Sequence, residues 1–214
     1  MNLSIEFKKP EITSAFDWQL TQEVNVKDES GSVIAKAEIE LITLNKHRDA
    51  SKSYEMLEQQ LGNTDWEIPL NVYFKGQNLD SNLCEALSVS ADTKKAKSHI
   101  MLEAISVQAN YRKQGVAKYL ITEIMKHYPK AQSITAFSMP LAEFVNPEDC
   151  ENSENKAYYT QLQLENTEHN QEELAQFFKQ VGFIEYKIDE SLLAEPLTFD
   201  IFVASQSTIN QSDE

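Results

Sequence analysis

The sequence has few of the residues that build metal centres, redox sites and disulfide scaffolds. Its two cysteines, Cys84 and Cys150, lie far apart and form no metal-binding or redox motif. Its four histidines form no metal-ligand spacing with acids or cysteines. We therefore expect no bound metal and two reduced thiols, as in a cytoplasmic protein.

Long apolar runs are also missing. No stretch of 18 apolar residues occurs, so the sequence predicts no transmembrane helix. The first residues show no basic stretch leading into an apolar one, so we expect no secretory signal. With 41% hydrophobic residues, the 214-residue chain can build one core. We predict a single domain over 1–204 and a polar, disordered tail over 205–214.

Positive charge is scarce. The chain has 19 lysines and arginines against 34 acidic residues, a net charge of −15. This balance argues against a nucleic-acid partner and against an anionic membrane. Residues 140–195 hold 13 of the acids and only three lysines. A solvated acidic surface and a site for a cationic partner both account for this segment, which includes an acidic insertion over 140–169.

Apolar periodicity gives the order of the elements. Alternating patterns predict strands over 18–26, 33–41, 184–188 and 197–203, and apolar runs predict strands over 100–107 and 134–137. Helical stripes predict helices over 49–62, 116–127 and 174–181. The first two strands flank the turn at 29–32 and read as a hairpin. The 100–107 strand is apolar on both faces, so we expect it to be central.

The segment from Arg112 to Ala117 joins the predicted central strand to the helix over 116–127. Backbone N–H groups at a helix start lack intrahelical partners, and the helix dipole adds partial positive charge there. Gly115 lets the backbone approach an anion without an intervening Cβ. The segment therefore predicts a site for a pyrophosphate.

This loop resembles the acyl-CoA loop of the GNAT superfamily of N-acyltransferases, at Arg112, Gly115 and Ala117. Gly182 and Phe183, after the helix over 174–181, resemble the Gly-Phe that follows the family's later helix. The order of elements also agrees over about residues 16–204. The resemblance implies an α/β fold: one mixed, twisted sheet of six to seven strands flanked by helices, with parted central strands.

The resemblance also implies how acetyl-CoA is held. The backbone of the central strand would pair with the pantetheine amides, and the Val107 N–H would face the thioester oxygen. The loop and the first helical turn would hold the pyrophosphate. The implied cofactor-binding residues are Ile105, Ser106, Val107, Arg112, Lys113, Gln114, Gly115, Val116, Ala117 and Lys118.

The catalytic groups are less defined. Glu103 on the central strand is our candidate for steadying the acceptor ammonium and passing on its proton; an ion pair or a rim position is the alternative. Many family members carry a tyrosine as general acid where this chain has Phe178. Tyr158, Tyr159 or Tyr186 would replace it, or the thiolate would leave unaided, since a thiol pKa is about 8.5. A catalytically weak domain is the third alternative.

The expected function is transfer of an acetyl group from acetyl-CoA to a primary amine, by direct attack in a ternary complex. The acceptor would be a cationic small molecule or a protein amine, and a homodimer is compatible with this reading. The principal rival is a non-catalytic acyl-CoA-binding module, followed by an interaction domain that binds no CoA. A toxin that acylates tRNA-linked amines is disfavoured by the charge.

Overall fold

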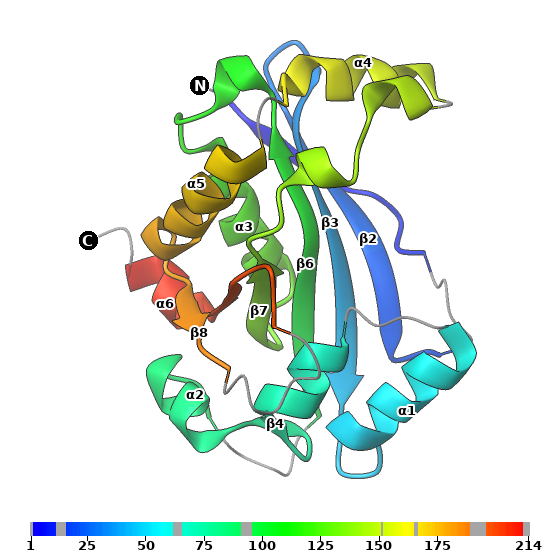
Figure 1. Ribbon diagram of the computed structural model, residues 1–214, viewed down its shortest axis with the longest axis vertical. Coiled ribbons are helices and arrows are strands. Elements are labelled where there is room, and N and C mark those ends of the chain that lie inside the picture. Colours follow the sequence, from blue (N-terminus) through cyan, green and yellow to red (C-terminus); the bar gives the residue numbers. More distant parts are fainter. Residues whose placement is uncertain are drawn as a thin grey trace.

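One seven-stranded sheet runs through the molecule (Figure 1). The structure, a computed structural model, describes residues 2–11, 16–61, 66–90, 96–150, 152–164, 167–188 and 196–211. The strand order is β1-β2-β3-β6-β7-β9-β8, and among these strands only β6 and β7 pair in parallel. The strands are β1 (Ser4–Phe7), β2 (Gln19–Lys27), β3 (Val33–Leu44), β6 (Lys97–Val107), β7 (Ala131–Phe137), β8 (Ile184–Tyr186) and β9 (Ile201–Ala204).

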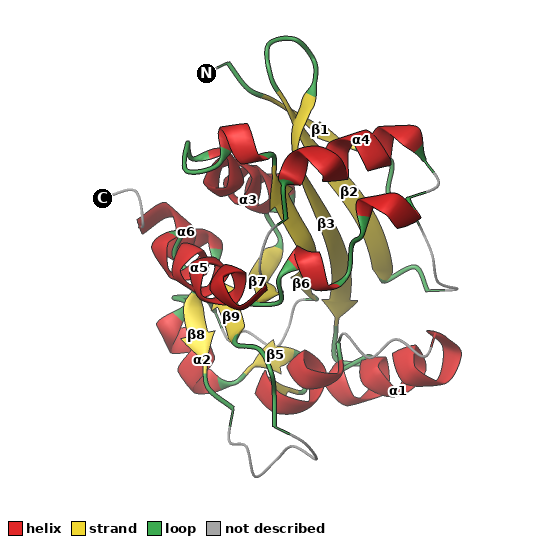
Figure 2. Cartoon of the chain, turned by 45° about the horizontal axis from the view of Figure 1, so that its top comes forward, coloured by secondary structure: helices red, strands yellow, loops and turns green. Residues whose placement is uncertain are grey.

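Helices cover both faces of the sheet (Figure 2). They are α1 (Ala50–Leu61), α2 (Ser81–Ala86), α3 (Val116–His127), α4 (Ser153–Leu162), α5 (Thr167–Gln180) and α6 (Gln206–Gln211). A π-helical turn (Pro69–Tyr73) precedes a small hairpin of β4 (Phe74–Lys75) and β5 (Asn78–Leu79). Short 3-10 turns lie at Ala109–Tyr111, Leu141–Glu143 and Pro147–Asp149. No helix within the described ranges is long and apolar enough to cross a bilayer.

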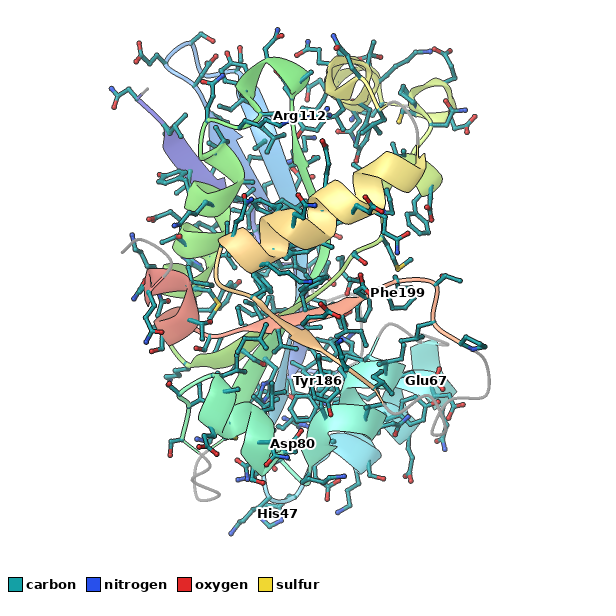
Figure 3. The ribbon with its side chains drawn as sticks, turned by 60° about the vertical axis from the view of Figure 1, so that its left-hand side comes forward. His47, Glu67, Asp80, Arg112, Tyr186 and Phe199 are labelled. Atoms are coloured by element: carbon teal, nitrogen blue, oxygen red, sulfur yellow. The ribbon has the colours of Figure 1, made fainter. Side chains whose placement is uncertain are left out.

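The first core lies between the sheet and the segments α1, the π-helical turn and α2. Trp66 and Tyr73 are among its largest fully buried side chains, and Tyr73 Oη lies 2.6 Å from Thr135 Oγ1 of β7. Tyr186 of β8 packs on the Tyr73 ring, with ring centroids 5.1 Å apart. Tyr186 and Asp80 lie at this end of the molecule, far from Arg112 in the same view (Figure 3).

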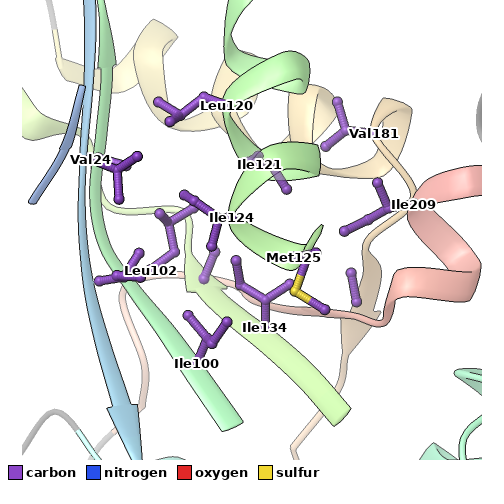
Figure 4. Packing of buried hydrophobic residues seen from close by; sticks show 14 of the residues in the cluster. Val24, Ile100, Leu102, Leu120, Ile121, Ile124, Met125, Ile134, Val181 and Ile209 are labelled. Atoms are coloured by element: carbon purple, nitrogen blue, oxygen red, sulfur yellow. The ribbon is translucent and has the colours of Figure 1, made fainter. Parts of the chain in front are cut away.

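The second core lies on the opposite face, beneath α3 (Figure 4). The helix turns one apolar stripe toward the sheet, and this stripe meets the inward side chains of the central strands. The labelled members are Val24, Ile100, Leu102, Leu120, Ile121, Ile124, Met125, Ile134, Val181 and Ile209. The helix bounds agree with the prediction over 116–127 because this stripe is regular along the whole segment.

The end of the chain departs from the sequence prediction. Residues 206–211 form α6, and Ile209 is fully buried in the second core, so the predicted disordered tail over 205–214 is wrong at 206–211. Gly182 makes room for this helix, since a Cβ there would overlap the Thr208 carbonyl oxygen. Residues 212–214 lie outside the described part of the chain.

Two further predictions needed adjustment. The last strand begins at Ile201 rather than at 197, and the edge strand β1 was not predicted. The acidic insertion over 140–169 holds two 3-10 turns and α4, and α5 begins within it. Its described acids, such as Glu143, Glu148 and Glu154, are exposed, as expected for a solvated surface.

Candidate functional site

The strand β6 loses one of its two neighbouring strands near its midpoint. Its pairing with β7 ends at Leu102, opposite Ala136, whereas its pairing with β3 continues to Val107, opposite Ala35. Glu103 is an extra residue in a β-bulge at this point, because Leu102 pairs with Ile39 while Ala104 pairs with the preceding residue of β3. The central strands therefore part here, and residues 103–107 have one open edge.

The register fixes which backbone groups face that open edge. Antiparallel pairs alternate between hydrogen-bonded and non-hydrogen-bonded positions. The Gln108 N–H donates to the Ile34 carbonyl at 2.9 Å, so Ser106 is also a hydrogen-bonded position. The N–H and C=O groups of Ile105 and Val107 consequently point away from β3, toward the opening.

The loop before α3 leads into a helix start without a side-chain cap. Gly115 caps the helix with φ 80° and makes no side-chain hydrogen bond to the first turn. Lys113 also has a positive φ of 59°. Successive N–H groups in such a turn, followed by a helix start, make a concavity suited to an anion. A Cβ on Gly115 would contact nothing within 4 Å, so the space in front of the loop is open.

These two features line one cavity of about 720 Å³. Nine of the ten predicted cofactor-binding residues lie on its wall: Ile105, Ser106, Val107, Arg112, Lys113, Gly115, Val116, Ala117 and Lys118. The exception is Gln114, whose Nε2 donates to the Asn110 carbonyl at 2.7 Å. The facing wall comes from α5 and from the end of the insertion, through Leu162, Leu164, Leu174, Phe177 and Val181.

Arg112 lies on the cavity wall and makes two hydrogen bonds within the chain. Its Nε donates to the Val107 carbonyl at 3.1 Å, and its Nη2 donates to the Leu162 carbonyl at the end of α4. The guanidinium therefore ties the end of β6 to the insertion (Figure 3).

The helix α4 is also attached to the open half of β6. Tyr158 Oη lies 2.8 Å from Ser106 Oγ and donates to the Ser106 carbonyl at 3.2 Å. Burial raises the pKa of Tyr158, which makes its phenol a poorer proton donor. Lys36 Nζ donates to Asn155 Oδ1 at 2.9 Å and lies over the Tyr158 ring.

The predicted catalytic residues do not converge on the cavity. Glu103 is exposed at the bulge where the strands part, next to the cavity-lining segment 105–107. Tyr158 and Tyr159 belong to α4 and are absent from the cavity wall, and so is Tyr186. Three strand spacings, roughly 14 Å, separate the Tyr186 strand from β6. Tyr186 packs on Tyr73, and burial together with Asp80 raises its pKa.

Phe178 does not occupy the cavity wall either. It is 1% exposed and packs against Phe183 and Phe202 in the second core, while its neighbour Phe177 faces the cavity. A hydroxyl at position 178 would therefore be buried among phenylalanines. The phenylalanine at this position, where the resemblance implies a tyrosine, therefore contributes to core packing and does not line the cavity.

Sequence reasoning missed Glu38. This residue of β3 lies opposite Ala104 and directly across from Glu23 of β2. Like charges directly opposite each other destabilise a sheet. The turn alone would not have shown this pairing, because a register shift between Val26 and Lys27 brings Glu38 opposite Glu23.

Comparisons with solved structures return N-acetyltransferases. Arabidopsis thaliana NAA60 in complex with acetyl-CoA is 14% identical, over 86% of this chain and 76% of that chain, with a TM-score of 0.40. Arylalkylamine N-acetyltransferase 2 from Aedes aegypti is 16% identical, over 86% and 73%, with a TM-score of 0.40. Chaetomium thermophilum Naa20 in complex with a bisubstrate analogue is 12% identical, over 88% and 68%, with a TM-score of 0.36.

No protein-family model matches the sequence, and a search among curated proteins gives no match. The fold assignment rests on the sheet itself. The mixed sheet flanked by helices and the parting of its central strands beyond Leu102 are what the resemblance of the loop implied. The chain has a GNAT-like fold. The predicted mixed sheet of six to seven strands flanked by helices is confirmed.

Proposed function

We propose that the protein is an N-acyltransferase that moves an acetyl group from acetyl-CoA to a primary amine in a ternary complex. The observation that carries this proposal is the single cavity bounded by the open edge of β6 and by the uncapped start of α3. A volume of about 720 Å³ is in the range of ligand-binding cavities.

The start of α3 would hold the pyrophosphate. The N-cap residue Gly115 has no side chain to cap the first-turn N–H groups, and Val116 and Ala117 of that turn line the cavity. Charged oxygens would satisfy these N–H groups and interact favourably with the helix dipole. Lys113 and Lys118 add formal positive charge on the same wall.

The open edge of β6 would hold the pantetheine arm and the thioester. The outward amides of Ile105 and Val107 would pair with the arm as an added strand does. In the transfer step the amine nitrogen bonds to the thioester carbon, the C–S bond breaks, and the amine proton is lost while the thiolate gains one. A preorganised N–H of this open edge on the developing oxyanion is worth roughly 3 kcal/mol.

Glu103 is the group we propose to receive the acceptor's proton. It lies at the bulge, where the strands part and the thioester would end. For the thiolate we propose departure without a dedicated acid. Tyr111, the tyrosine on the cavity wall, donates its hydroxyl to Asp28 at 2.9 Å, and Tyr158 is engaged by Ser106.

The test is the variant Gly115→Glu, studied by calorimetry with acetyl-CoA. A carboxylate placed at the helix start would repel the pyrophosphate, so we expect affinity to fall at least 100-fold, about 2.7 kcal/mol. Gly76→Glu is the matched control, because Gly76 also has a positive φ and open space but lies in the β4–β5 turn. Equal affinities of both variants and the parent would refute the placement.

The rival function, acyl-CoA binding without transfer, is favoured by one observation: no tyrosine with a free hydroxyl lines the cavity among the described residues. It predicts binding of acetyl-CoA with no amine-dependent release of CoA. Amine-dependent thiol release, followed with a thiol reagent, separates the two functions.

A further inference from the structure

The face of the sheet on the α1 side carries a row of acids beside the site where β6 opens. Glu23 of β2 and Glu38 of β3 lie directly opposite each other, and Glu38 lies opposite Ala104 at the bulge. Residues 23 and 25 share this face because side chains alternate along a strand. The other face carries Val24, Ala37 and Ile39, which are buried in the second core.

Both lysines near this row already have partners, and one of these partners is Glu23. Lys8 forms an ion pair with Glu23, with Nζ 2.5 Å from Oε1. Lys36 donates to Asn155 on α4 and lies over the Tyr158 ring. Glu38 forms no ion pair with any lysine, arginine or histidine that the structure describes, and it is exposed. A carboxylate beside the opening is thus available to a ligand.

A buried asparagine beside these acids has a side-chain oxygen that accepts no hydrogen bond from the described residues. Asn25 is 2% exposed, and its Nδ2 donates to Glu23 Oε1 at 2.8 Å. Its Oδ1 has no hydrogen-bond partner among the described residues. Asn25 lies diagonal to Glu38 on the same face, since it pairs with Lys36. A buried oxygen of this kind costs free energy until an N–H reaches it, so the missing partner is a donor.

Glu38 is the exposed member of this row, whereas Asn25 is buried. The helices α4 and α1 lie over opposite ends of β2 and β3 (Figure 1). Loss of hydration, together with the charges of Glu23 and Glu11, raises the pKa of the Glu38 carboxyl. A bound cation would oppose this effect, because an opposite charge favours the ionised carboxylate. Burial raises the pKa of the Tyr159 phenol on α4, and the nearby charge of Glu38 raises it further.

We propose that Glu38, with Glu23 and Asn25, binds the second cationic group of a diamine or polyamine acceptor whose first amine is acetylated at Glu103. This inference rests on the proposed function and assigns its acceptor class. Adjacent strands lie about 4.8 Å apart, so the row places anionic groups roughly 5–10 Å from the bulge. The acceptor would therefore carry its second charge at that distance from the reacting nitrogen.

The acidic residues of the insertion are not needed for this specificity. Glu148 pairs with Lys156 on the surface, and its side chain is 77% exposed. Salt screens the attraction between such exposed carboxylates and a cation within about 8–10 Å. These acids would therefore steer a cationic acceptor toward the protein without fixing its position. Glu23 and Glu38 on β2 and β3 are the acidic residues that lie next to the place where β6 opens.

The experiment compares 1,4-diaminobutane with 1-butylamine as acceptors, using the full chain and saturating acetyl-CoA. The parent protein should favour the diamine in kcat/KM. Glu38→Gln should raise KM for the diamine about tenfold, because it removes the carboxylate that contacts the second ammonium group. The kcat for the diamine and both kinetic constants for butylamine should stay within about twofold of the parent values. Glu85→Gln on α2, an exposed acid at the far end, is the control with the same change of charge and should behave as the parent.

The outcomes separate the inference from the function on which it rests. Equal use of both amines by the parent, or equal losses for both amines in Glu38→Gln, would overturn the inference while the acyltransferase function stands. Failure of the parent protein to bind acetyl-CoA in calorimetry would overturn the proposed function, and the inference with it. Retained acetyl-CoA affinity in Glu38→Gln shows that the variant is folded.

Discussion

The two halves of β6 belong to one strand, yet they have different surroundings. Residues 97–102 pair with strands on both sides, and Ile100 and Met101 are fully buried. Residues 103–107 pair on one side, are exposed or half-buried, and line the cavity from Ile105 to Val107. The difference arises from the partner strand, because β7 leaves the ladder after Ala136.

The comparison shows that the open edge at the site arises because β7 no longer pairs with the outer half of β6. The inner half fixes the position of the outer half through its buried side chains and its parallel pairing. The outer half keeps backbone donors and acceptors that no strand uses. We therefore expect substitutions in the inner half to lower stability and substitutions in the outer half to lower ligand affinity.

The largest expected effect separates these halves directly. Ile100→Ala should lower the free energy of unfolding by about 2–5 kcal/mol, because the side chain is fully buried between the sheet and α3. Ile105→Ala is the matched substitution in the outer half, where the side chain is half-buried. It should cost less than about 1.5 kcal/mol. Urea denaturation of both variants measures the difference.

Acetyl-CoA affinity should show the reverse order for the same two variants. Ile100→Ala should bind as the parent does under conditions where it is folded, while Ile105→Ala, on the cavity wall, should bind more weakly. If both variants lose stability and affinity in equal proportion, the two halves are one cooperative unit and the comparison fails.

A smaller effect concerns the acid sensitivity of the inner half. Burial lowers the pKa of His99 to about 3 from its ordinary 6.5, with a smaller contribution from Lys97. His99 Nδ1 lies 2.9 Å from Ser133 Oγ, and Nε2 has no partner among the described residues. Between these pH values the unfolded chain binds a proton at this residue that the folded chain does not. Stability should therefore fall as pH drops from about 6.5, by up to about 1.4 kcal/mol per pH unit.

The variant His99→Phe removes this proton and should flatten the slope of unfolding free energy against pH between 6.5 and 4. Above pH 6.5 the slopes of parent and variant should agree, since neither state then binds the proton. Urea denaturation at several pH values measures both slopes. Identical slopes between pH 6.5 and 4 would show that His99 is protonated in the folded protein.

Much of the fold could be predicted because its patterns are local. The hairpin of β2 and β3 and the bounds of α3 follow from regular alternation and from one regular stripe. The segment α6 could not be predicted in this way. Its polar sequence contains one buried residue, Ile209, and its place depends on the room left by Gly182 in a distant part of the chain.

The candidate site likewise contains residues that could be predicted from the sequence and residues that could not. The loop residues could be predicted because a backbone motif at a helix start depends on a few adjacent letters. The tyrosines could not be placed, because the position of α4 is set by contacts such as those between Tyr158 and Ser106, 52 residues apart. Glu38 follows only when the hairpin register and the bulge are considered together.

Amide hydrogen exchange of β6, followed residue by residue by NMR with and without acetyl-CoA, tests the central claim most directly. The account predicts that the ligand slows exchange at Ile105 and Val107, whose N–H groups face the opening, and leaves Ile100 and Leu102 unchanged. Binding of acetyl-CoA without protection at Ile105 and Val107 would contradict it, because the ligand would then lie away from the open edge of β6.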